Sequence, residues 1–204
     1  MPAGLFLYTF VPMITDIKTL PATFSYRQAR ARGISKRQLY RWRDEGVVEL
    51  LGRGLYRRTD APVADVDLIE VAHRAPRATL CLTSALVQHG LSDAIPASHD
   101  VAVPRGWRTP VVSAPVTWHR FDLATFEVGR EMLRLDEQTT IGLYGAARSI
   151  VDAFRLASQH GPEVGHEALR RWLRRGGKPA DLLEVARYFP RTAPRLRSAL
   201  EVLL

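Results

Sequence analysis

Two short segments near the start of the chain have helical spacing and open in the same way. Ser25 and Ser35 are each followed three positions later by glutamine, a pattern in which the serine and glutamine side chains cap the first turn of a helix. Each segment ends in a glycine, Gly33 or Gly46, which readily adopts the left-handed conformation that ends helices. The sequence therefore predicts two helices joined by a short turn, over about residues 25–32 and 35–45.

The second of these helices is predicted to have one apolar and one basic side. At about 100° per residue, Leu39 and Trp42 fall on one side together with Gln38. The opposite side carries Lys36, Arg37, Tyr40 and Arg41. A narrow apolar stripe suits a small core, and a basic stripe with one tyrosine suits a helix that lies in the major groove of DNA.

The spacing changes after Gly46 to that of β-strands. "VVELL" and "LYRR" are separated by Gly52, Arg53 and Gly54, which predicts a hairpin with an arginine at its tip. A helix-turn-helix followed by a basic hairpin is the pattern of a winged helix, in which the helix reads bases and the hairpin contacts the backbone.

The remaining three quarters of the chain are predicted to form a mixed domain. "ADVDLIEVAHRAP" and "ATLCLTSALVQHG" have helical spacing, and strands are predicted at "HDVAVP", "VTWHRF", "EMLRLD" and "TTIGLY". Helices follow, punctuated by proline and glycine, over about residues 145–158, 163–175, 179–188 and 193–203. The predicted fold class is α+β: an N-terminal winged helix-turn-helix, then a small β-sheet beside a helical C-terminal bundle.

The positive charge of the chain is concentrated in its first sixty residues. The formal net charge is +8, and residues 1–60 hold 11 Lys/Arg against 5 Asp/Glu, a net of +6. Such a concentration indicates a polyanionic partner. The DNA-contacting residues predicted from the helix and the hairpin are Arg27, Ser35, Lys36, Arg37, Tyr40, Arg41, Arg53, Arg57 and Arg58.

A second basic cluster lies in the predicted C-terminal bundle, in "ALRRWLRRGGK". Cations are favoured near the C-terminal end of a helix, so a solvated face is the simpler interpretation. The alternative is an accessory surface for DNA or for an acidic protein, formed by Arg170, Arg171, Arg174 and Arg175.

Other features of the chain narrow its setting. Cys81 is the single cysteine, and its apolar surroundings predict a buried free thiol. No run approaches the ~20 apolar residues of a membrane helix. The segment "LFLYTFVPM" lacks the flanks of a signal peptide, so residues 1–12 are interpreted as a poorly ordered extension and a cytoplasmic protein is expected.

Patterns of enzymatic or metal chemistry are not found in the sequence. The six histidines are scattered without metal-ligand spacing. No Gly-x-Ser-x-Gly elbow, phosphate-binding glycine loop or His-Glu-x-x-His helix is present. Asp65 and Asp67 are interpreted as acids that favour the N-terminal end of a helix. The expectation is a protein with no catalytic residues, no metal and no cofactor.

The residues also carry a family resemblance. "GISKRQLYRWRDEGVVELLGRGLYRR" resembles the winged-helix domain of AbiEi-type antitoxins from type IV bacterial toxin–antitoxin systems. "LVQHGLSDAIPASHDVAVPRGW" and "GAARSIVDAF" are similar to later segments of that family, so the resemblance extends over about residues 13–204. It implies a winged-helix DNA-binding domain over residues 13–60 and an antitoxin domain over residues 61–204.

The resemblance also implies two activities. The first is repression of the protein's own operon through binding to inverted repeats in double-stranded promoter DNA. The second is counteraction of an AbiEii-like nucleotidyltransferase toxin, with or without direct contact. The alternatives are a winged-helix regulator whose C-terminal domain binds a ligand or dimerises without any toxin, and a nucleic-acid-processing enzyme.

Overall fold

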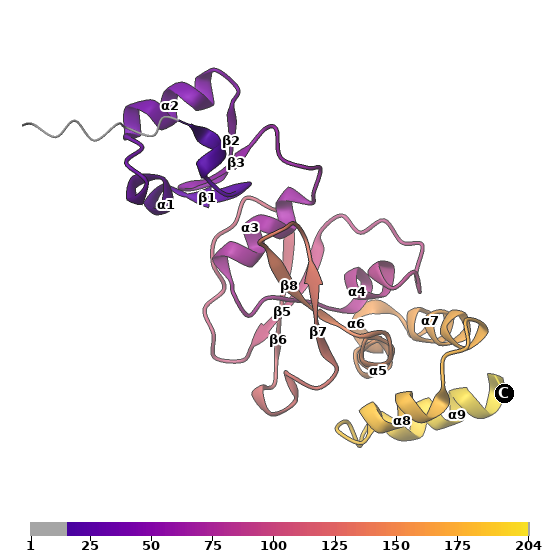
Figure 1. The fold of residues 1–204 in the computed structure, drawn as a ribbon. Helices are drawn as coiled ribbons and strands as arrows, with labels where there is room; N and C mark the ends of the chain where they lie inside the picture. The colour runs from indigo at the N-terminus through magenta and orange to yellow at the C-terminus, as the bar shows by residue number, and fades with distance from the viewer. Residues whose placement is uncertain (1–15, 204) are drawn as a thin grey trace, which may run out of the picture. The chain divides into compact units, whose positions relative to one another are not determined.

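The computed structural model describes residues 16–203 of the 204-residue chain and divides it into two compact units, with the boundary between Val63 and Ala64 (Figure 1). The N-terminal unit combines two helices with a small sheet, and the C-terminal unit combines a larger sheet with a group of helices. The predicted α+β class is confirmed. The extension predicted for residues 1–12 lies outside the described residues.

The N-terminal unit has the element order expected of a winged helix. Its elements are η1 (Ile17–Thr19), β1 (Thr23–Ser25), α1 (Tyr26–Ala31), α2 (Lys36–Asp44), β2 (Val48–Gly52) and β3 (Leu55–Arg58). Both helices begin as predicted, since the hydroxyl oxygens of Ser25 and Ser35 accept from the third amide of each helix. Gly33 and Gly46, at φ of 79° and 71°, end them.

The two strands of the hairpin form a sheet with a third strand that the sequence did not predict. The strand order is β1-β3-β2, all antiparallel. Phe24 of β1 and Tyr56 of β3 stack with their ring centres 6.0 Å apart, and they join Leu39 and Trp42 of α2 in one buried cluster. The apolar side of α2 is therefore fixed against the sheet.

The C-terminal unit is built on a mixed five-stranded sheet in the order β6-β5-β4-β8-β7. Its strands are β4 (Thr79–Leu80), β5 (His99–Pro104), β6 (Val116–Phe121), β7 (Arg130–Arg134) and β8 (Thr140–Tyr144). β4 pairs antiparallel with β5 and parallel with β8. The prediction of one helix over "ATLCLTSALVQHG" is thus wrong at its start, because Thr79 and Leu80 pair on both sides and the helix begins at Leu82.

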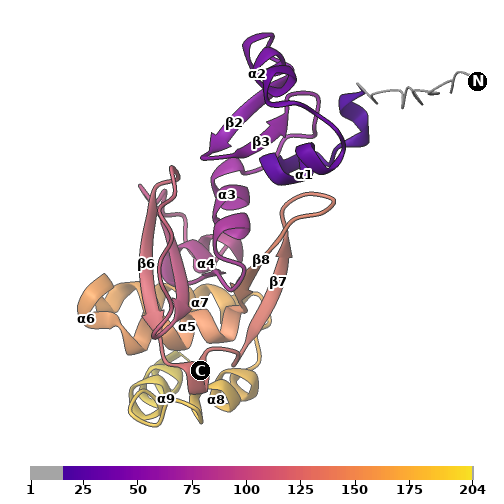
Figure 2. The same ribbon diagram turned by 90° about the vertical axis from the view of Figure 1, so that its left-hand side faces the viewer.

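The helices of this unit are α3 (Val66–Arg74), α4 (Leu82–Gln88), η2 (Leu123–Thr125), α5 (Ala146–Arg155), α6 (Ala157–His160), α7 (Pro162–Arg174), α8 (Pro179–Ala186) and α9 (Ala193–Leu203). The helix predicted over residues 145–158 is divided at Leu156 into α5 and α6. Both views place α5–α7 between the sheet and the α8–α9 pair (Figures 1 and 2). No helix within residues 16–203 is long and apolar enough to cross a membrane.

Both faces of the five-stranded sheet are covered. Val101 and Leu143 join one buried cluster with α3, whereas the next residues, Ala102 and Tyr144, join another. Consecutive residues of a strand point to opposite faces, so the two clusters lie on opposite sides of the sheet. Cys81 belongs to the second cluster as the predicted buried free thiol, and burial raises the pKa of that thiol well above its usual value.

Candidate nucleic-acid interface

The start of α2 is fixed by a cap and by its buried side. The Ser35 hydroxyl oxygen accepts a hydrogen bond of 3.1 Å from the Gln38 amide. Leu39 and Trp42 are buried at 0% and 7% exposure. Because these contacts set the rotation of the helix, its opposite side must face solvent. Ser35, predicted to contact DNA, acts in this structure as the cap.

The exposed side of α2 brings the predicted residues together. Lys36, Arg37, Tyr40 and Arg41, with Asp44, line one open hollow of about 590 Å³, and all of them are exposed. Such a surface carries three cations, which attract phosphates, and the polar and flat side chain of a tyrosine, which can contact bases.

Tyr40 is held between two cations of its own helix. The Lys36 Nζ atom lies 5.3 Å from the centre of the Tyr40 ring, and the Arg43 Cζ atom lies 5.0 Å from it. These distances are within the range of cation–π attraction. The ring is therefore partly preorganised, although 39% of the residue remains exposed.

The counter-charges on α2 are weak competitors for a phosphate. The Arg41 Nε atom lies 3.4 Å from a Glu45 carboxylate oxygen, and both side chains are more than half exposed, at 65% and 51%. Exposed ion pairs contribute little because water screens them. A phosphate can therefore displace Glu45 at small cost.

The hairpin presents Arg53 at its tip, between β2 and β3. The Arg53 side chain is exposed, and Gly54 beside it has a φ of 69°, as a tight turn requires. The Gly54 carbonyl oxygen accepts from the Tyr26 amide at 2.9 Å, which ties the hairpin to the start of α1. Arg27, the second residue of α1, is exposed.

Arg57, which the sequence predicts to contact DNA, is instead buried and bonded within the N-terminal unit. It is only 3% exposed, and its guanidinium donates to Thr23 Oγ1 at 2.8 Å and to the Pro62 carbonyl oxygen at 2.7 Å. It lies on the same face of β3 as Leu55, which is buried. The guanidinium therefore ties three parts of the unit together.

Arg58 is also held by groups of the protein. Its Nε atom donates to Asp60 Oδ1 at 2.8 Å, and its Nη1 atom donates to the Leu20 carbonyl oxygen at 3.1 Å. The hydrogen bond from Arg58 lowers the pKa of Asp60. For Arg58 to contact a phosphate, as the sequence predicts, it must give up a carboxylate that is already in place.

The second basic cluster predicted from the sequence divides into two pairs. Arg171 donates to Asp93 at 2.6 Å and also binds Glu167, and Arg175 donates to the His89 carbonyl oxygen at 3.0 Å. Arg170 and Arg174 are exposed. Two of the four arginines therefore stabilise the fold, and two remain on the surface of α7.

One group of potential metal ligands occurs within the described residues. Single ligand atoms of Asp65, Asp67 and His99 lie within 4.8 Å of one another. Asp65 also caps α3 by accepting from the Leu68 amide at 3.0 Å, and Asp67 lies in the first turn, as the sequence predicted. Acids at the start of a helix are favoured by its dipole, which is the role that the sequence predicts for these two aspartates.

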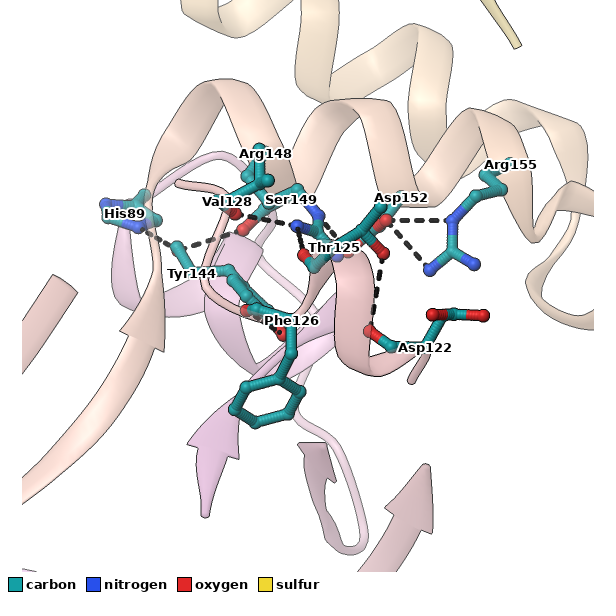
Figure 3. A network of polar contacts seen from close by, with 10 residues as sticks. All are labelled: His89, Asp122, Thr125, Phe126, Val128, Tyr144, Arg148, Ser149, Asp152 and Arg155. Carbon is teal, nitrogen blue, oxygen red and sulfur yellow. Dashed lines mark hydrogen bonds and ion pairs between the residues drawn. The ribbon is translucent and has the colours of Figure 1, made fainter. Parts of the chain in front are cut away.

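The sequence did not identify a buried charge network in the C-terminal unit (Figure 3). The side chains of Arg148 and Asp152 are both 0% exposed and pair at 2.9 Å. Asp152 also pairs with Arg155 at 2.9 Å. Arg148 donates to the carbonyl oxygens of Thr125 and Val128 at 2.8 and 2.6 Å. The signal was an arginine and an aspartate four positions apart in the otherwise apolar helix "GAARSIVDAF".

Comparisons with known proteins address mainly the N-terminal unit. Residues 22–59 match the model of a family described as "Transcriptional regulator, AbiEi antitoxin". No curated protein matches the chain. Among solved structures, the crystal structure of the Rv2827c protein from Mycobacterium tuberculosis is similar at 18% identity and a TM-score of 0.49, and the match covers 89% of this chain and 76% of that one.

Proposed function

We propose that this protein is a DNA-binding transcriptional regulator of the AbiEi antitoxin type, acting in the cytoplasm. In this proposal α2 enters the major groove, where Lys36 and Tyr40 face bases and Arg37 and Arg41 face the flanking phosphates. Arg53 extends the contact to the neighbouring backbone. The observation that carries the proposal is the single exposed surface formed by these side chains on α2, within the segment that matches the family model.

The DNA target is proposed to be an inverted repeat in the promoter of the protein's own operon. The purified protein should bind its promoter duplex in preference to a random duplex of equal length in a competition shift assay. Lys36→Ala and Tyr40→Ala should each reduce that preference by about tenfold, because a good base contact discriminates by about 1–3 kcal/mol. Arg53→Ala should weaken binding to both duplexes alike.

Arg197→Ala is the matched control, since Arg197 is an exposed arginine of the other unit. It should leave the affinity for both duplexes within about twofold. Equal affinity of the unaltered protein for promoter and random DNA would refute the repressor role.

The second part of the proposal is that the protein counteracts a nucleotidyltransferase-like toxin, and it includes no catalytic step. The family description, which names an antitoxin, supports this part. Co-expression should relieve the growth arrest caused by a toxin encoded beside it. The full chain with Lys36→Glu and Arg37→Glu should lose DNA binding and still relieve the arrest, which separates the two roles. Growth arrest that persists when the toxin and this protein are co-expressed would contradict the antitoxin role and would leave the DNA-binding role untouched.

A further inference from the structure

A groove crosses the surface formed by α5, α7 and α9 in the C-terminal unit. One hollow of about 530 Å³ is floored by Phe154 and walled by Ala199 and Val202 of α9 and by His166 of α7. A second hollow, of about 570 Å³, includes Tyr188. Phe154 and Arg195 line both hollows, which are therefore adjacent, and the two together form the C-terminal groove.

The first hollow is lined mainly by apolar residues, and arginines line both hollows. Arg170 and Arg195 line the first hollow, and Arg191 and Arg195 line the second. None of these three arginines forms an ion pair within residues 16–203, and no carboxylate lines either hollow. Unpaired guanidinium groups on the rim favour an anionic occupant.

The acidic residues nearest in sequence to Arg170 do not neutralise this rim. Glu163 and Glu167 line a neighbouring hollow that shares His166 and Arg170 with the groove, but neither glutamate forms an ion pair with Arg170 within the described residues. Glu167 is already bound by Arg171. The rim of the groove therefore keeps its positive charge.

The apolar edge of the groove is exposed, whereas Phe154 at its floor and Ala199 in its wall are only 5% and 6% exposed. Val202 is 84% exposed and Tyr188 is 57% exposed. The His166 ring packs on Phe154 with its centre 4.9 Å away, and its Nδ1 atom lies 2.8 Å from the Pro162 carbonyl oxygen. A fixed apolar wall reduces the entropy lost when an occupant binds.

We propose that the C-terminal groove binds an acidic segment of a protein partner. One aliphatic or aromatic side chain of that segment would cover Val202 and the exposed edge of Phe154, and flanking carboxylates would pair with Arg170 and Arg195. Such a partner matches both properties of the groove, whereas a nucleic acid backbone matches only the charge. The His166 ring covers part of Phe154, which leaves less of its face for a stacked base.

This inference does not depend on the proposed role of α2, because none of the groove residues belongs to the N-terminal unit. The probe is a fluorescein-labelled peptide of about 14 residues in which glutamates surround one phenylalanine and one leucine three positions apart. With the full-length protein, fluorescence polarisation should give a Kd of about 10–100 μM. Replacing the phenylalanine and leucine by serine should weaken binding by about tenfold.

The protein variants separate the groove from general charge attraction. Arg170→Glu with Arg195→Glu should weaken binding of the acidic peptide by about tenfold or more. Arg197→Glu is the matched control, because it lies on α9 and is exposed but lines neither hollow; it should change the Kd by less than about twofold. Circular dichroism of each variant confirms that it is folded.

Several results would overturn the proposal. Equal weakening by Arg197→Glu, or equal affinity for the serine peptide, would reduce the interaction to charge alone. No binding at about 1 mM protein would remove it. A double variant that loses affinity for duplex DNA, with no effect on the peptide, would assign the surface to nucleic acid. Concentration-dependent self-association that the double variant abolishes would assign it to a second copy of this chain.

Discussion

Replacing Asp152 by asparagine should destabilise the C-terminal unit more than almost any other single isosteric change. Asp152 is the carboxylate that neutralises both Arg148 and Arg155, through contacts of 2.9 Å with each. Asparagine keeps the shape but removes the charge, and it turns one acceptor into a donor that faces a guanidinium. The Arg148 side chain, at 0% exposure, is then left buried without a counter-charge.

The size of the effect follows from what remains around Arg148. The carbonyl oxygens of Thr125 and Val128 still accept its hydrogen bonds, and the ring centres of Tyr144 and Phe189 still lie 4.3 and 4.6 Å from its Cζ atom. Neither the carbonyl oxygens nor the aromatic rings carry a formal charge. Breaking a buried ion pair from one side costs about 3–5 kcal/mol, a large part of the ~5–15 kcal/mol by which domains are stable.

Urea unfolding followed by circular dichroism and tryptophan fluorescence measures this loss. The midpoint of unfolding of the C-terminal unit should move to a lower urea concentration. In a thermal melt, the Tm of this unit should fall by about 10–15 °C. Glu184→Gln, an exposed change on α8 outside its first turn, should stay within about 0.5 kcal/mol of the unaltered protein. Arg148→Met combined with Asp152→Leu should recover part of the loss, because it removes both charges. A cost below about 1 kcal/mol for Asp152→Asn would refute this reasoning.

Three further predictions concern other parts of the molecule. Arg57→Met should lower the stability of the N-terminal unit by about 2–3 kcal/mol in thermal melts, since it removes two buried hydrogen bonds of a charged group; Arg37→Ala, a change at an exposed arginine of α2, should leave the melt within about 0.5 kcal/mol. Ser35→Ala should cost about 1 kcal/mol by removing the cap of α2, measured in the same melts. Because burial raises the pKa of the Cys81 thiol, a disulfide reagent at pH 8 should react with it only in urea, and reaction in the native state would contradict its burial.

The elements that could be predicted from the sequence are those whose cause is local. The starts of α1 and α2 depend on a serine and the amide three residues later, and their ends depend on one glycine each. These contacts lie within a few residues of one another. The rotation of α2 about its axis could also be predicted from the sequence, because the spacing of Leu39 and Trp42 defines the buried side of the helix.

The features that could not be predicted depend on distant partners. β4 is two residues long, too short to show alternation, and it is a strand only because β5 and β8 pair with it. Arg57 is held in the interior by a hydrogen bond to Thr23, which lies 34 residues earlier in the chain, so the sequence around Arg57 does not show this contact. The sequence still held one signal for Arg57, since the buried Leu55 two positions earlier shares its face of the strand.

The chain has more basic residues than the proposed DNA interface uses, because several of its arginines form hydrogen bonds within the fold. A guanidinium has five N–H donors and can bind several oxygens at once. Arg57, Arg148 and Arg175 all use these donors on backbone carbonyl oxygens of their own unit. Three phosphate contacts, from Arg37, Arg41 and Arg53, give a slope of log K against log salt of about −2.7, whereas adding Arg57 and Arg58 would give about −4.5. The salt dependence of DNA binding thus shows whether Arg57 and Arg58 contact phosphates or serve only to stabilise the fold.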